Sequence, residues 1–112
     1  MLDKKAILEL NDIRIEKVHV PEWKGDIYIK EMTGNERDSF ALAHRVMDKT
    51  KSSIGALYAV FTVVDKDGNL LFSEADISSL SKKSGKALDR IFDKAEELNR
   101  VFSDIEDDAK KS

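Results

Sequence analysis

The chain has 112 residues, a length that predicts one domain over residues 1–112 with a single hydrophobic core. Charged residues make up 37% of the chain and its formal net charge is -3, which argues against nucleic acid as a partner because phosphate binding needs a basic face. The absence of cysteine excludes disulfides and thiolate metal sites, as suits a reducing cytoplasm. The longest apolar run, residues 56–64, is too short to span a bilayer and the chain begins with no secretory signal, so we expect no membrane partner.

The first predicted element is a short helix, capped by Asp3 and ended by Asn11 or Asp12. Its apolar residues fall at roughly helical spacing: Leu2, Ala6, Ile7 and Leu10. A helix of one or two turns is marginal in water, so it needs a surface to dock against.

Two strands are predicted next, over residues 13–20 and 27–31. The apolar residues of the first strand form two alternating pairs that are out of phase: Ile13 and Ile15, then Val18 and Val20. A bulge or a break near residues 16–17 would give them a common buried face. Pro21 ends the first strand because it lacks an amide hydrogen, and the short connection to the second strand predicts an antiparallel hairpin.

Two helices are predicted in the middle of the chain. Thr33 and Glu36 form a capping box, and the helix that follows them should turn Phe40, Ala43 and Met47 inward. Residues 54–64 are ambiguous, since alanine and leucine favour a helix whereas the β-branched residues near the end favour a buried strand. On length we predict a helix, capped by Ser53.

A turn is predicted directly after that segment. Its residues are Asp65, Asp67, Gly68 and Asn69. Glycine tolerates positive φ, and Asp and Asn side chains bond to nearby backbone. A calcium loop is the alternative, but that loop needs its glycine at the sixth position and here it stands at the fourth. Ser73 stands three residues before Asp76, an approximate capping box that predicts a short helix over residues 73–80.

The last helix is the clearest element of the sequence. Its apolar residues recur at steps of three and four: Leu88, Ile91, Ala95, Leu98, Phe102 and Ile105. Phe92 and Val101 widen this stripe, and the polar tail from about residue 104 is expected to fray. The sequence therefore predicts an α+β fold, mainly α, with a small N-terminal β-hairpin followed by about four helices, the last one long and amphipathic.

Residues that carry chemistry form no recognisable constellation. His19 and His44 are the only histidines, and they share no metal-binding spacing. The sequence contains neither a nucleophilic serine motif nor a glycine-rich phosphate loop. We therefore expect no enzyme activity, no metal and no cofactor.

Two apolar features point to a protein partner. Trp23, beside Pro21, either anchors a partner or covers the core of the hairpin. The stripe of the last helix either packs on the domain or stays partly free, and its width in so small a domain favours a partner. The residues that we predict to bind a partner are Trp23, Leu88, Ile91, Phe92, Leu98, Val101 and Phe102.

Several segments together resemble one protein family. Residues 18–23, VHVPEW, resemble the VxVPEW segment of tail assembly chaperones from long-tailed bacteriophages. Residues 27–38 and 64–76 are similar to two further segments of that family, and residues 98–99 are similar to an LN pair near its end. The resemblance covers about residues 7–102, in the same order and at similar spacing.

The resemblance implies a mainly helical fold and a transient, non-enzymatic function in the host cell cytoplasm. Such chaperones bind the tape measure protein, keep its long apolar helical surface soluble and are absent from the finished virion. A longer form made by ribosomal frameshifting helps to recruit tail tube protein.

On this resemblance, the hypothesis is that Phe92, Leu98, Val101 and Phe102 contribute to the surface for the tape measure protein. Homo-oligomerisation through the same stripe is an equal alternative. The alternative function is that of a structural tail or head–tail connector subunit retained in the virion.

Overall fold

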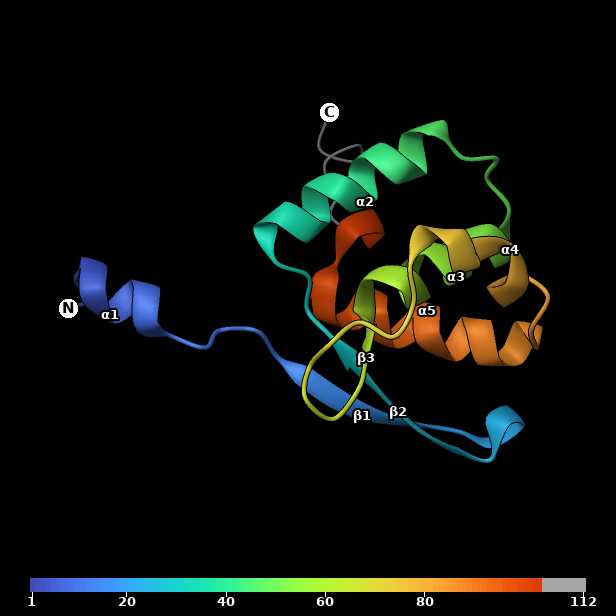
Figure 1. The fold of residues 1–112 in the computed structure, drawn as a ribbon, viewed down its shortest axis with the longest axis horizontal. Coiled ribbons are helices and arrows are strands. Elements are labelled where there is room, and N and C mark those ends of the chain that lie inside the picture. The colour runs from blue at the N-terminus through green and yellow to red at the C-terminus, as the bar shows by residue number, and fades with distance from the viewer. Residues whose placement is uncertain (104–112) are drawn as a thin grey trace.

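The computed structural model describes residues 1–103, which form a three-stranded antiparallel sheet and helices that pack against it (Figure 1). The elements are α1 (Lys4–Glu9), β1 (Ile15–Val20), the 3-10 turn η1 (Pro21–Trp23), β2 (Gly25–Lys30), α2 (Gly34–Val46), α3 (Lys51–Thr62), β3 (Val63–Val64), the 3-10 turn η2 (Glu74–Asp76), α4 (Ile77–Leu80) and α5 (Gly85–Asn99). The predicted α+β class, with a hairpin followed by helices, is confirmed. The tail predicted to fray lies outside the described residues.

The hairpin of β1 and β2 contains no irregularity. The two strands pair in an unbroken antiparallel register that starts with Ile15 opposite Lys30. The predicted bulge or break near residues 16–17 is therefore wrong. Val18 and Val20 face the core, whereas Ile15 lies on the other face, where its side chain approaches Gly68 of the turn after β3. Because Ile15 has a neighbour on its own side of the sheet, it does not need to share a face with Val18 and Val20.

The ambiguous segment is a helix that ends in a short strand. The predicted helix is confirmed as far as Thr62, and the strand alternative applies to Val63 and Val64 alone. These two β-branched residues pair antiparallel with β2 and make a third strand. The cap of α3 is Thr50 rather than the predicted Ser53, whose hydroxyl instead accepts a hydrogen bond from the Thr50 N–H at 2.8 Å.

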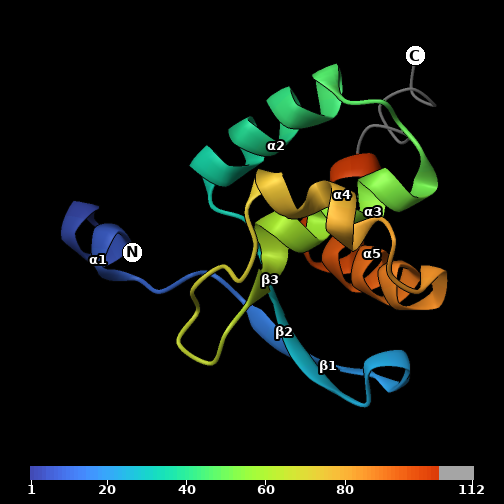
Figure 2. The same cartoon turned by 45° about the vertical axis from the view of Figure 1, so that its right-hand side comes forward.

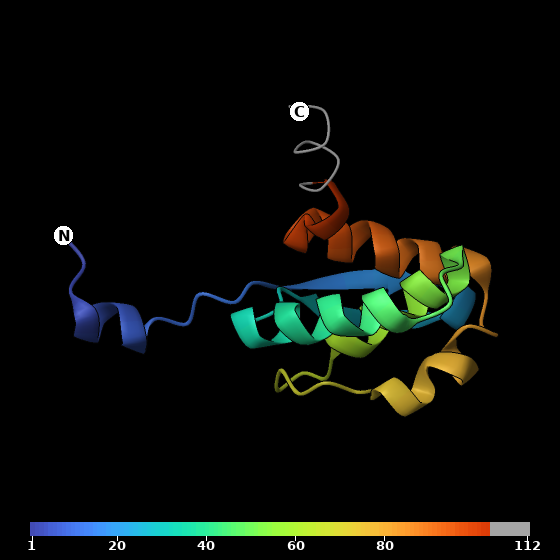
Figure 3. The same cartoon turned by 90° about the horizontal axis from the view of Figure 1, so that it is seen from above.

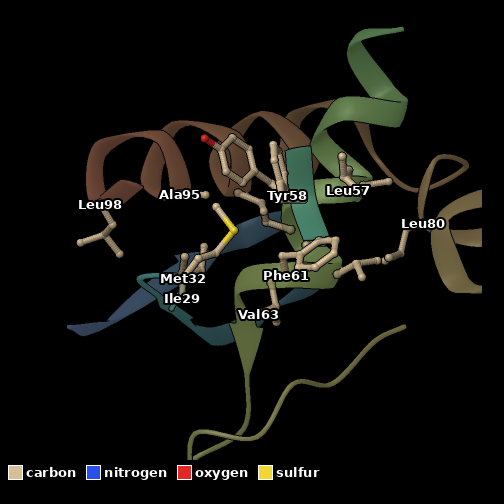
Figure 4. Packing of buried hydrophobic residues seen from close by; sticks show 14 residues of the cluster. Ile29, Met32, Leu57, Tyr58, Phe61, Val63, Leu80, Ala95 and Leu98 are labelled. Carbon is tan, nitrogen blue, oxygen red and sulfur yellow. The ribbon is translucent and has the colours of Figure 1, made fainter. Parts of the chain in front are cut away.

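The core is built around α3. Every residue of this helix from Gly55 to Thr62 is buried, so α3 is covered on all sides. The sheet covers it with Ile29, α2 with Phe40 and α5 with Ile91. The close view in Figure 4 shows Tyr58 and Phe61 of α3 between labelled side chains of the sheet, α4 and α5. A helix that is apolar all round is stable only when it is enclosed in this way.

The last helix stops earlier than its apolar pattern predicts. It ends at Asn99, and Arg100 adopts a left-handed conformation with φ 53°, so the turn of Val101–Ser103 runs in a new direction. The prediction of one continuous helix through Phe102 is wrong. Ile105 lies outside the residues that the structure describes.

The Asn99 side chain fixes this helix end to the sheet. Its Oδ1 accepts a hydrogen bond from the Met32 N–H at 2.8 Å, and its Nδ2 donates to the Ala95 carbonyl at 2.9 Å and to the Lys30 carbonyl at 3.4 Å. Its backbone carbonyl accepts from the Arg37 guanidinium at 2.7 Å. The side chain of Asn99 therefore joins α5 to the end of β2, and its backbone carbonyl adds a link to α2.

The helix α1 lies away from the other elements. Its predicted cap is confirmed, since the Asp3 carboxylate accepts a hydrogen bond from the Ala6 N–H at 2.9 Å. The predicted end at Asn11 or Asp12 is wrong, because the helix ends at Glu9 and Leu10 is already extended. All three views show α1 at the end of an extended segment, separate from the rest of the molecule (Figures 1, 2 and 3). None of its residues, Lys4–Glu9, is buried against the described chain.

Replacing Asn99 by alanine should lower the free energy of unfolding by about 2–3 kcal/mol, because the buried Met32 N–H then loses its partner. Urea unfolding followed by circular dichroism measures this change. The matched control is Asn35→Ala on exposed α2 surface, which should shift the same quantity by less than about 0.5 kcal/mol. Equal effects of the two substitutions would contradict the role given to Asn99.

Candidate interaction surface

The residues predicted to bind a partner divide into two groups in the structure. Leu88, Ile91 and Leu98 are buried in the core beneath α5. For these three residues, the structure therefore agrees with the alternative prediction that the stripe packs on the domain. The remaining four are half-buried and keep part of their surface open: Trp23, Phe92, Val101 and Phe102.

An apolar groove lies between the first turn of α3 and the middle of α5. This α3–α5 groove has a volume of about 280 Å³ and is lined by Lys51, Ile54, Leu88, Asp89 and Phe92. A second hollow of about 200 Å³ shares three of these residues and extends toward the start of α5. The groove therefore joins two residues of the predicted surface to two residues of α3.

Charges of both signs stand at the rim of the groove. The Lys51 ammonium lies 3.6 Å from the Asp89 carboxylate, and both side chains are largely exposed. An ion pair so exposed contributes little to stability, because water screens it. Its effect here is to place a polar edge around an apolar surface.

Close contact between the two helices shapes the floor of the groove. A Cβ at Gly55 would stand 3.3 Å from the Leu88 Cβ, which is tighter than ordinary packing. Glycine at this position thus lets α3 approach α5 closely. The groove opens beside this contact, at the preceding residue Ile54, which is half-buried.

Trp23 lies at a second hollow, on the side of the molecule near α4. This hollow has a volume of about 300 Å³ and is lined by Trp23, Phe72, Leu80 and Lys83. Trp23 also packs against the core cluster, so it serves the hairpin's core as well as lining an opening. The structure does not bring it together with the stripe of α5 in one hollow among the described residues.

Aromatic rings connect the groove to the turn after α5. Phe92 contacts Tyr58 with ring centroids 5.4 Å apart, and it stacks on Phe102 at 5.8 Å. Phe102 in turn meets His44 of α2 at 5.2 Å. Burial lowers the pKa of His44, and the nearby charge of Lys49 adds to this effect. The cluster holds the turn at residues 101–103 against α2 and α3.

Glu96 fastens the same turn through hydrogen bonds. Its carboxylate accepts from the Tyr58 hydroxyl at 2.6 Å, from the Phe102 N–H at 3.1 Å and from the Ser103 N–H and hydroxyl at 2.5 and 2.7 Å. Burial by itself raises the pKa of Glu96, but these donors outweigh it, so the pKa lies below its usual value. Burial raises the pKa of Tyr58, and its bond to Glu96 raises it further.

The residues of the predicted turn lie in a tight loop between β3 and Leu70. The Asp65 carboxylate accepts hydrogen bonds from the Asp67 N–H at 2.8 Å and the Asn69 N–H at 3.0 Å, and Gly68 has φ +86°. These backbone bonds hold the pKa of Asp65 below its usual value. The carboxylate of Asp65 therefore already accepts hydrogen bonds from backbone amides of its own loop.

Within residues 1–103, no group of three or more His, Cys, Asp or Glu side chains is placed to hold a metal ion. No helix among these residues is both long and apolar enough to cross a membrane.

Sequence reasoning missed the α3 side of the groove. Ile54 falls in the segment whose helix-or-strand state was open, so its position relative to α5 could not be inferred. The spacing of Gly55 ahead of a run of apolar residues is the signal of close helix packing that could have found it.

Comparison with known proteins gives a family and a fold. A model of the phage tail assembly chaperone family matches residues 2–111. The solved structure of the bacteriophage HK97 tail assembly chaperone matches with a TM-score of 0.59 at 20% sequence identity, covering 85% of this chain and 89% of that chain. No curated protein sequence matches. The structural match shows a shared fold.

Substitution of Glu96 by glutamine should destabilise the protein by about 1–2 kcal/mol at pH 7, because charge-assisted hydrogen bonds become neutral ones. The folded-state pKa of Glu96 is lowered, so its stabilisation is present above the unfolded pKa near 4.5 and is lost as the pH falls through the folded value. Urea unfolding of both proteins from pH 7 to pH 3 should show the difference shrinking below about pH 4.5. Glu97→Gln, an exposed neighbour, is the control, and an equal pH-dependent difference there would contradict the assignment.

Proposed function

The chain belongs to the phage tail assembly chaperone family, and from this premise we propose that it binds the tape measure protein and keeps the apolar helical surface of that protein soluble during tail assembly. In this role it acts in the host cell cytoplasm by binding alone, without a catalysed reaction. It leaves before the virion is complete. A longer, frameshifted form of the chain recruits the tail tube subunits.

The α3–α5 groove is the observation that carries this proposal. A long amphipathic helix is recognised when its apolar side chains enter a hydrophobic groove at helical spacing. The groove offers apolar side chains from two helices, Ile54 and Phe92, above a floor formed by Leu88. Concave apolar surfaces of this kind take the anchor residues that dominate binding energy.

The charged rim suits a chaperone. Lys51 and Asp89 present opposite charges beside the apolar floor, so the empty groove remains hydrated at its edge. A partner helix whose own polar residues flank its apolar stripe meets both charges when it docks. The charged rim therefore favours binding of an amphipathic helix over binding of a wholly apolar surface.

The proposal assigns different roles to the residues predicted from sequence. Phe92 contacts the partner and Leu88 forms the floor of its site. Ile91 and Leu98 support the groove from within the core. Phe102 acts by stacking on Phe92, which holds that ring in place, and Val101 supports the site by packing against the core cluster.

Ile54→Glu tests the groove. Placing a carboxylate there should lower the amount of tape measure protein that stays soluble and co-purifies on co-expression by at least about tenfold, because a buried anchor site is worth about 2 kcal/mol or more. Leu71→Glu is the matched control, since it also puts a charge on an apolar residue but outside the groove. Thermal unfolding of both variants shows whether they fold, and retained binding by a folded Ile54→Glu protein would overturn the site.

Mass spectrometry of purified virions separates the chaperone from a structural subunit. We expect the chain to be missing from mature particles while it is abundant in the infected cell. Stoichiometric copies in the particle, in amounts like those of the tail proteins, would contradict the proposal and assign a structural or connector role.

A further inference from the structure

The hollow beside Trp23 is an apolar opening that the proposed function leaves unused. This Trp23 hollow, of about 300 Å³, is lined by Trp23, Phe72, Leu80 and Lys83. Leu80 is buried, and the two aromatic side chains are half-buried and pack against the core cluster. The core therefore holds the apolar lining in place, and a preformed hollow binds an apolar side chain without the cost of first opening.

Lysine side chains gather around the Trp23 hollow. Lys83 lines it, and Lys24 follows Trp23 directly, in a left-handed conformation with φ 55°. Lys86 lies in the first turn of α5, shortly after Lys83. All three lysines are exposed, and within residues 1–103 none of them forms an ion pair.

The acidic residues nearest the Trp23 hollow already have partners. The Glu22 carboxylate accepts hydrogen bonds from the Arg90 guanidinium at 2.8 and 3.1 Å. These bonds chiefly lower the pKa of Glu22, and the charge of Lys86 adds to the effect, which places Lys86 on this side of the molecule. The Asp76 carboxylate accepts a hydrogen bond from the Ser73 N–H at 2.8 Å.

Three further carboxylates of the neighbouring segments lie in other surroundings. An oxygen of Asp26 lies 2.8 Å from Nδ1 of His19. Asp89 lines the α3–α5 groove, and Glu74 lines a separate hollow on α2. The lysines around the Trp23 hollow therefore keep a positive charge that no carboxylate of the described chain contacts.

We propose that the Trp23 hollow binds an acidic segment of a partner protein other than this chain, with one large apolar side chain of that segment seated against Trp23 and Phe72. The carboxylates that flank this side chain meet the lysines of the rim. An apolar anchor in a preformed hollow supplies affinity, and complementary charge supplies orientation and selectivity. This contact lies outside the α3–α5 groove and does not depend on binding of the tape measure protein.

The charges favour an acidic protein segment over a nucleic acid. A nucleic acid needs a basic face that follows its backbone, whereas this chain as a whole is acidic, with a formal net charge of -3. The apolar lining further requires a ligand with a large apolar side chain. A peptide segment supplies that side chain and the flanking carboxylates together.

Fluorescence of Trp23 tests the site directly, because this residue is the only tryptophan of the chain. The probe is a synthetic peptide without tryptophan, in which one leucine stands between two pairs of aspartates. We expect saturable binding that moves the Trp23 emission to shorter wavelength and protects it from acrylamide quenching.

Two matched peptides separate the apolar anchor from the charges. Replacing the leucine by alanine, or the aspartates by lysines, should each raise the Kd at least about tenfold. A Kd equal to that of either control, or no saturable change in Trp23 emission with the acidic peptide, would overturn the proposal.

Lys83→Glu tests the rim of the hollow. This substitution should weaken binding of the acidic peptide at least about tenfold, because like charges then face each other. Lys66→Glu, at an exposed lysine outside the Trp23 hollow, is the matched control and should leave the Kd unchanged. Circular dichroism verifies that both variants fold, and equal effects of the two substitutions would overturn the proposal.

Dilution of the unmodified chain distinguishes a partner protein from a second copy. Residues 104–108 of the sequence also place acidic residues around an isoleucine, so another copy is an alternative occupant. The Trp23 emission of the chain alone should stay constant on dilution. A shift to longer wavelength on dilution would show that a second copy fills the hollow and would overturn the proposal.

Discussion

The structure depends on the enclosure of one helix, α3. Its residues are buried on every side from Gly55 to Thr62, which a helix in water does not permit unless other elements surround it. The hairpin, α2 and α5 each cover one side of α3. The need to enclose α3 explains why these elements stand before and after it in the chain. Even the short strand β3 serves it, because the pairing of Val63 and Val64 with β2 places the end of α3 directly on the sheet.

The α3–α5 groove lies where this enclosure stops. The first turn of α3, residues 51–53, is polar and at least partly exposed. Before Ile54, α3 therefore offers no apolar side chain for α5 to cover. Apolar side chains at that boundary are half-buried by their own fold, which keeps them ordered while one side remains open. The same residues thus complete the core and offer a surface. One part of the α5 stripe can therefore pack in the core while another part remains open to a partner.

Local sequence signals predicted most of the fold. Capping residues, the hairpin around Pro21 and the helical spacing of α5 each act within a few residues, so the pattern contains them. The end of α5 depends instead on Asn99, whose partner Met32 stands 67 positions earlier, and no local pattern reveals such a contact. The candidate site was half predicted for the same reason. Phe92 and Leu88 belong to a visible stripe, whereas Ile54 joins them only through the packing of α3 on α5.

The long-range bonds of Asn99 also have a consequence for synthesis of the chain. Since α5 is the last wall of the core, a nascent chain that has already left the ribosome as far as α3 still exposes that apolar helix. It can be enclosed only after Asn99 has emerged and reached the end of β2. The native fold is therefore completed only after α5 has been translated as far as Asn99, and until then the protein itself exposes the kind of apolar surface that chaperones of the cell bind.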